Sequence, residues 1–206
     1  MRRAARLKSW CSMSLGILFL MILCPVRAEA HLNSTGMGPV YDGLLHFLQS
    51  PEDVIPVLAL ALFAGLRGAA HGRWALFVLP AAWLLGGLVG LASTSSGNSI
   101  LTVVSFLLLG GLVAADARLS LRATTVITGL LGLEHGYLNG AGMGRPGIGA
   151  VALLGIVFMV FVFVAFSTAL VVSLRWPWTR IAVRVVGSWI VASGLLMLGW
   201  NLRGKL

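Results

Sequence analysis

The chain has few charged residues. Only 10% of its 206 residues are Asp, Glu, Lys or Arg, whereas 58% are hydrophobic, and its mean hydropathy is +0.96. Because soluble domains carry roughly a quarter charged residues, this composition excludes an ordinary soluble protein. The sequence also contains apolar runs of about twenty residues, which indicate a polytopic protein of the lipid bilayer.

Cysteine is nearly absent, and both cysteines, Cys11 and Cys24, lie in a segment with the pattern of a secretory signal peptide. The basic stretch "MRRAARLKSW" precedes the short apolar run "MSLGILFLMILCPV" and the small-residue site at 28–30. We therefore predict a signal peptide over residues 1–30 that is cleaved after Ala30; the alternative is an uncleaved first transmembrane helix. The mature chain would then have no cysteine for disulfides, thiolate metal ligands or nucleophilic catalysis.

Two classes of partner are excluded in spite of the formal net charge of +9. The basic residues are scattered among short loops, with no basic stripe interleaved with aromatic residues, so no nucleic acid partner is expected. The glycine-rich stretches lack the basic residue and strand context of a phosphate-binding loop, so no nucleotide site is expected either.

The fold predicted for residues 31–206 is a single all-α domain, a polytopic membrane bundle of about six transmembrane helices. Each predicted span is long enough for the hydrocarbon slab at about 1.5 Å of rise per residue. The connections are short, as between antiparallel neighbours in a bundle. The spans are 54–70, 74–92, 99–115, 123–141, 148–173 and 181–202.

The distribution of basic residues predicts the orientation. Seven arginines follow the first, third and fifth spans, against three basic residues on the other side. The positive-inside rule places the first group in the cytoplasm, and a cleaved signal peptide gives the same topology. We expect a multi-pass protein of the bacterial inner membrane with its mature N-terminus outside. The first group is Arg67, Arg73, Arg118, Arg122, Arg175, Arg180 and Arg184, and the second is Arg145, Arg203 and Lys205.

Glycines recur along the fourth predicted span at positions 129, 132, 136 and 140. Steps of three or four residues place them on one side of a helix, where small residues allow two backbones to approach closely. This stripe predicts a helix-packing face.

The same span carries an ionisable pair in the sequence "GLEHGYLNG". Glu134 lies twelve residues after Arg122, or about 18 Å across the membrane, which places it and His135 in the outer half. Ionisable groups inside a membrane rarely face lipid, so at least one of the two is expected to face the bundle interior. His71, in contrast, is expected in a solvated loop at the inner face.

A second acidic and histidine-bearing stretch, "YDGLLHFLQSPEDVIP" at 41–56, is predicted on the same outer side. Asp42 and His46 are four residues apart, so on a helical turn they share a face and could bind one ion. Glu52 and Asp53 follow at the start of the first span. An alternative role for these two carboxylates is compensation of the dipole at a helix N-terminus.

Together these residues predict an outward-facing site for a metal ion, since imidazole and carboxylate suit nickel, cobalt, zinc or copper. The N-terminal His31 of the mature chain would add its α-amine and imidazole. The alternative is that polar residues collect in short outer loops without binding anything. The predicted metal-binding residues are His31, Asp42, His46, Glu52, Asp53, Glu134 and His135.

The layout and two short segments resemble the HupE/UreJ family of small bacterial membrane proteins. "GLLHFLQSPED" at 43–53 is similar to the motif G-[FL]-L-H-P-x-x-G-x-D-H, and "HGYLNGAG" at 135–142 is similar to H-G-x-A-H-G-x-E. The resemblance implies a nickel or cobalt permease associated with hydrogenase or urease. It also implies metalloenzyme-maturation proteins as partners, and self-association is a further expectation.

Some positions of the two motifs match residues of this sequence, and others do not. His46 matches the leading histidine of the first motif, Glu52 falls at its aspartate, and Asp53 stands where the family has a histidine. In the second motif His135 and its following glycine match, whereas Asn139 replaces the second histidine and position 142 lacks the acid. Glu134, just before that motif, would supply a replacement carboxylate.

The function predicted from the sequence is therefore transport or handling of a divalent transition metal, which is substrate rather than a permanently bound cofactor. A non-transporting membrane scaffold or assembly protein is the alternative. We expect no enzymatic activity, because the closest match to an intramembrane serine-protease motif, "SSGN" at 95–98, falls in an outer loop.

Overall fold

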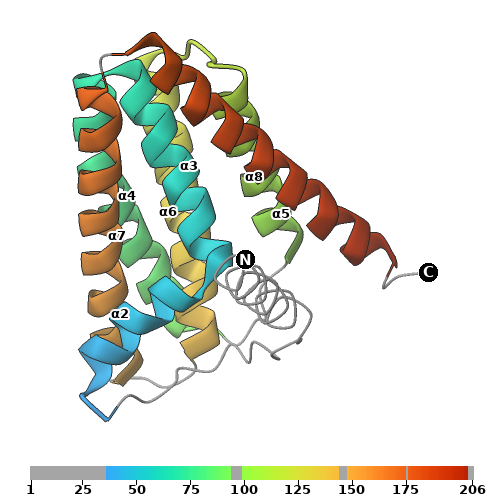
Figure 1. Cartoon of the computed structure of the whole chain (residues 1–206). Helices are drawn as coiled ribbons and strands as arrows, with labels where there is room; N and C mark the ends of the chain where they lie inside the picture. Colours follow the sequence, from blue (N-terminus) through green and yellow to red (C-terminus); the bar gives the residue numbers. More distant parts are fainter. Residues whose placement is uncertain (1–35, 94–98, 144–147, 175, 204–206) are drawn as a thin grey trace, which may run out of the picture. The chain divides into compact units, whose positions relative to one another are not determined.

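The computed structural model describes residues 36–93, 99–143, 148–174 and 176–203. The described residues form seven α-helices and no strand, so the prediction of an all-α helical bundle is confirmed (Figure 1). The predicted signal peptide, residues 1–30, and His31 lie outside the described residues. The helices are α2 (Pro39–Gln49), α3 (Pro51–Arg67), α4 (Ala69–Leu91), α5 (Ser99–Ala114), α6 (Leu121–Met143), α7 (Ile148–Ser173) and α8 (Pro177–Arg203).

Each predicted span corresponds to one of the helices α3 to α8. Within the described residues, α4, α7 and α8 are each long and apolar enough to cross a membrane, which agrees with a membrane protein. Helices α2 and α3 pass the same test together, although the chain bends by 73° between them, and the apolar part of α5 is shorter. Length and composition thus give three crossings, or up to four, and six crossings stay a prediction.

Two connections differ from the sequence-based prediction. Residues 39–49 form the separate helix α2, which is joined to α3 at Ser50. Helix α4 begins at Ala69, five residues before the predicted span, because Gly68 with a φ of +104° makes the whole turn from α3. The prediction of His71 in a solvated loop is therefore wrong. Its side chain is half-buried on α4, and its Nε2 atom is shielded from solvent.

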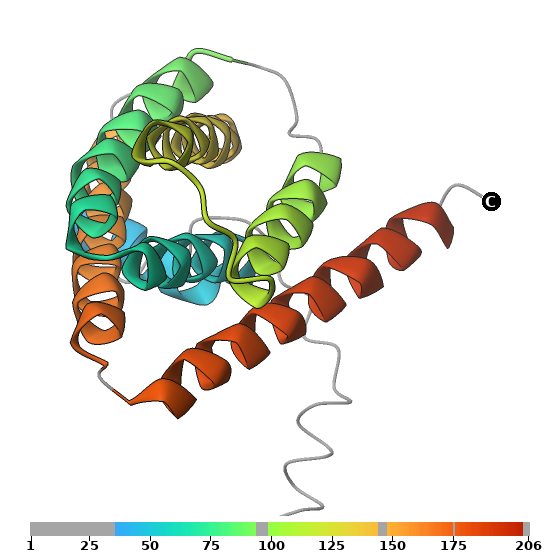
Figure 2. The same ribbon diagram turned by 90° about the horizontal axis from the view of Figure 1, so that it is seen from above.

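Helices α4 and α6 pack most extensively, and glycines on both helices account for the close approach (Figure 2). A Cβ atom at Gly136 would run into the backbone of Trp83, and one at Gly140 into the backbone of Gly87. The predicted packing face is therefore present from residue 132 onward. Gly129, at its beginning, makes only an ordinary contact with a valine side chain.

Glycines also allow close backbone contact in two other helix pairs. Gly43 of α2 and Gly155 of α7 each lie against the backbone of the other helix, and Gly110 of α5 lies against α8. In Figure 2, α8 runs across α5, with which it makes most of its contacts. The outward side of α8 is apolar and exposed, with Trp189, Leu196 and Trp200 between 72% and 80% exposed, as expected for a surface that faces lipid.

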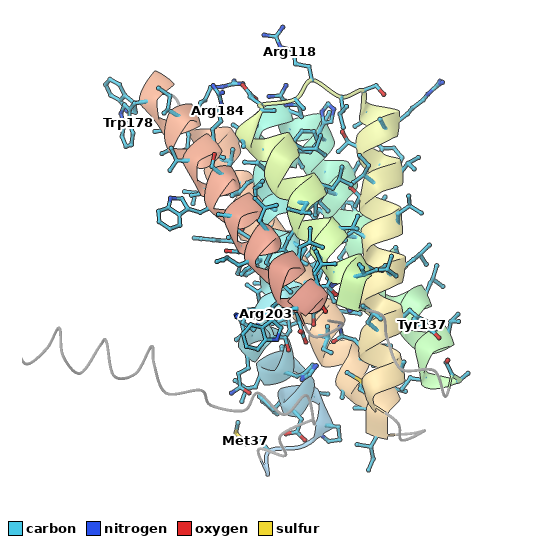
Figure 3. All side chains as sticks on the ribbon, turned by 90° about the vertical axis from the view of Figure 1, so that its right-hand side faces the viewer. Met37, Arg118, Tyr137, Trp178, Arg184 and Arg203 are labelled. Atoms are coloured by element: carbon cyan, nitrogen blue, oxygen red, sulfur yellow. The ribbon has the colours of Figure 1, made fainter. Side chains whose placement is uncertain are left out.

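The two ends of the bundle differ in the basic residues they carry. Figure 3 shows Arg118 and Arg184 at one end, whereas Tyr137 and Arg203 lie towards the other. Arg118 and Arg184, which were predicted on the inner side, and Arg203, which was predicted on the outer side, therefore lie towards opposite ends of the bundle.

The glycine packing predicts a position-dependent effect of added methyl groups on α6. Gly140→Ala should lower the free energy of unfolding by about 1–3 kcal/mol, the usual effect of overpacking, because the α4 backbone leaves no space for the added methyl group. Gly129→Ala, on the same helix, should be neutral or stabilise the protein by up to about 1 kcal/mol through helix propensity. Thermal unfolding in detergent measures both, and equal melting temperatures would contradict this packing.

Candidate functional site

The imidazole of His135 occupies a buried position among four helices. His135 lies on α6 and is 1% exposed. Glycine packing brings α6 against the backbone of Trp83 on α4, and the indole of Trp83 lies beside the imidazole, with ring centroids 5.5 Å apart. The other groups at the ring come from α3, from α5 and from α6 itself.

A carboxylate from α3 fixes one side of this ring. Asp53, in the first turn of α3, places its Oδ1 atom 2.9 Å from Nδ1 of His135. The amide of Asn139 donates to the other carboxylate oxygen, Oδ2, at 2.9 Å, and also to the backbone carbonyl of His135. Both oxygens of Asp53 are therefore engaged by α6. Compensation of the α3 dipole alone does not describe its role.

Oxygen atoms surround the other ring nitrogen. Nε2 of His135 lies 3.2 Å from Oγ of Ser105 on α5 and 3.3 Å from Oε2 of Glu134. The hydroxyl of Ser105 donates its proton to the carbonyl of Thr102 at 2.7 Å, so Oγ presents a lone pair to the ring. Two acceptors thus face Nε2, an arrangement that needs a proton or another cation between them.

Two further oxygen atoms near this ring are buried without a hydrogen-bond partner among the described residues. They are Oε1 of Glu134 and Oδ1 of Asn139. A buried acceptor without a donor lowers stability by about 1–3 kcal/mol. The carboxyl groups of Asp53 and Glu134 also lie on either side of the one imidazole, at Nδ1 and at Nε2. The site therefore favours added positive charge.

The structure brings together three of the predicted metal-binding residues, Asp53, Glu134 and His135. Glu52 is exposed but lies within electrostatic range of Asp53, His46 and His135. Asp42 and His46 are half-buried on α2, beyond the bend at Ser50.

A complete metal site is not assembled in this arrangement. Among the described residues, no group of three or more His, Cys, Asp or Glu side chains is placed to hold one metal ion. The reason lies in the pairing at the ring, since the bond to Asp53 occupies Nδ1 of His135. Nε2 and the carboxylate of Glu134 are then the two groups left for a metal. The seven-residue metal site stays a prediction.

Two residues of the site were missed by sequence analysis, and a third was placed only near it. Ser105 and Trp83 lie in apolar spans, and no neighbouring residue in the sequence marks Trp83 as a partner of His135. The one available signal was that Thr102 and Ser105 put two hydroxyls one turn apart in an otherwise apolar helix. Asn139 was recognised from its motif position, but its bond to Asp53 was not.

In space, the imidazole of His135 lies between the carboxylate of Asp53 and the hydroxyl of Ser105. The same three residue types are arranged in this way in the catalytic triad of serine hydrolases. The hydroxyl proton of Ser105, however, is donated to the Thr102 carbonyl rather than to the imidazole. A carboxylate oxygen of Glu134 also lies at the same Nε2 atom. The arrangement accordingly offers a position for a cation rather than an activated nucleophile.

The buried pair predicts unequal effects at two adjacent carboxylates. Asp53→Ala leaves Nδ1 of His135 and the amide of Asn139 without their acceptor, and should lower the free energy of unfolding by about 3 kcal/mol or more. Glu52→Ala removes an exposed neighbour and should change it by less than about 1 kcal/mol. Thermal unfolding of both variants in one detergent provides the measurement. Similar losses of stability would contradict the Asp53–His135 pairing.

Comparison with known families supports one assignment. A family model described as HupE / UreJ protein matches residues 18–197 of the chain, a range that includes Asp53, Ser105, Glu134 and His135. No curated protein and no solved structure matches the chain.

Proposed function

The chain belongs to the HupE/UreJ family, and from this we propose that it is a permease, or a metal-delivering accessory protein, for a divalent transition metal of the nickel and cobalt class. The observation that carries the proposal is the buried imidazole of His135, bonded to Asp53 through one nitrogen and facing the carboxylate of Glu134 through the other. This donor set has the chemistry that such metals prefer.

In the proposed site, Asp53 orients the imidazole of His135 and Glu134 binds the metal ion. A carboxylate on Nδ1 keeps the proton on that nitrogen, so that the lone pair of Nε2 is available to a metal; such carboxylate–histidine pairs support many metal sites. Glu134 adds a carboxylate on the same side of the ring. The metal replaces the proton that otherwise lies between Nε2 and its two oxygen neighbours.

A site with two protein ligands suits transport better than storage. An ion that must move on has to be bound strongly enough to enter and weakly enough to leave. Water or an arriving ligand would complete the coordination. Residues predicted on the outer side, His31, Asp42, His46 and the exposed Glu52, would collect the ion before it reaches His135, in a protein of the bacterial inner membrane with its mature N-terminus outside.

The test is accumulation of nickel and cobalt by cells that express single variants. His135→Ala and Glu134→Gln should each reduce metal accumulation to the level of cells without the protein, because each removes one of the two ligands. His71→Ala, a histidine on the described α4 rather than at the site, is the matched control and should leave uptake unchanged. Membrane levels of each variant are measured by immunoblotting.

Uptake that survives both site substitutions, at normal membrane levels, would contradict the proposed mechanism. Loss of uptake in the His71 variant as well would show that the assay reports general damage to the fold.

A non-transporting scaffold is the second candidate function, and it is favoured by the lack of a three-ligand cluster in the described residues. In that case the bonds of His135 would only hold α3, α5 and α6 together. A titration of the purified mature chain with nickel, cobalt, zinc, copper and iron separates the two functions. A permease should bind at least one of these metals and lose it in His135→Ala, whereas a scaffold should bind none.

A further inference from the structure

The end of the bundle that carries Arg118 (Figure 3) has a second polar cluster, which metal transport does not use. Asp116 lies in the turn between α5 and α6, with a φ of +49°. Its carboxylate pairs with Arg67 of α3 and with Nη2 of Arg180 on α8, at 2.9 and 3.2 Å. One carboxylate thus links three parts of the chain.

Positive charge exceeds negative charge in this cluster. Arg67 and Arg180 both bind the carboxylate of Asp116, and the guanidinium of Arg118 lies within electrostatic range of Arg67. The side chain of Arg67 is only 9% exposed, and its Nε atom is buried without a hydrogen-bond partner. Like charges in a partly buried setting repel one another strongly, so a second anion at this place would stabilise the protein.

The outer layer of the cluster is open to such an anion. Arg118, Arg180 and Arg184 are exposed. Both bonds from Arg180 to Asp116 use Nη2, and among the described residues no acceptor is bonded to its Nε or Nη1. Arg184, one turn further along α8, donates its Nε to the carbonyl of Ala114 at 2.9 Å, and this bond fixes its guanidinium beside the end of α5.

The surroundings identify the class of anion. Trp176 and Trp178, which are 68% and 63% exposed, precede Arg180 in the sequence, and aromatic side chains of this kind lie at the level of lipid head groups. Arginine binds phosphate oxygens through paired N–H groups. We propose that Arg118, Arg180 and Arg184 bind the phosphate of an acidic phospholipid at this end of the bundle.

Native mass spectrometry of the full chain, released from detergent with a mixture of phosphatidylglycerol and phosphatidylcholine, tests the proposal. The wild-type protein should retain phosphatidylglycerol in preference to phosphatidylcholine. Arg180→Gln and Arg118→Gln should each reduce its retention about fivefold, the usual effect of one basic residue near an anionic lipid. Arg73→Gln removes the same charge from an exposed position on α4 and should retain the lipid as the wild type does.

Arg118 has no bond to Asp116 among the described contacts, so its variant keeps the test valid if the Arg180 variant fails to fold. Equal retention of both lipids, or an equal loss in Arg73→Gln, would overturn the proposal. A further arm adds inorganic phosphate. If inorganic phosphate displaces phosphatidylglycerol completely at millimolar concentration, the site is one for free phosphate, and the lipid assignment is wrong. Metal accumulation does not enter this test, so its outcome is independent of the proposed transport function.

Discussion

The hydrogen-bonded pair of Asp53 and His135 is the interaction on which the candidate site depends. It joins the first turn of α3 to α6 across 82 positions of the sequence, and Ser105 connects the same imidazole to α5. Ionisable groups buried in a membrane protein are unfavourable unless they are paired. Here the pairing leaves one ring nitrogen and one carboxylate, that of Glu134, facing each other, which is why the cluster suits a cation.

The glycines of α4 and α6 make this pairing geometrically possible. Lipid tails are as apolar as leucine side chains, so helices in a bilayer associate through close packing and hydrogen bonds rather than through the hydrophobic effect. Backbone contact along the two helices fixes the rotation of α6. With the glycines turned towards α4, the adjacent His135 points towards α3 and α5, where Asp53 and Ser105 meet it. The same segment of α6 therefore provides both the glycine face that packs against α4 and the imidazole of the candidate site.

Hydropathy and glycine spacing predicted much of this arrangement, because both are local properties of the sequence. The helices and the packing face of α6 follow from periodicity. The expectation that at least one of Glu134 and His135 faces the interior is met by His135, which is 1% exposed. The separate helix α2 and the position of His71 were not predicted, since each depends on the geometry of one residue, Ser50 or Gly68. The partners of His135 depend on how distant helices align, which one sequence does not specify.

An X-ray absorption spectrum of cobalt bound to a variant in which His135 is the only histidine tests the central claim most directly. The chain has four histidines, so His31→Gln, His46→Gln and His71→Gln together leave one imidazole. A metal held by His135 and Glu134 predicts scattering from a single imidazole in a shell of oxygen ligands. Cobalt that fails to bind this variant, or that binds with oxygen ligands alone, would contradict a metal site at His135.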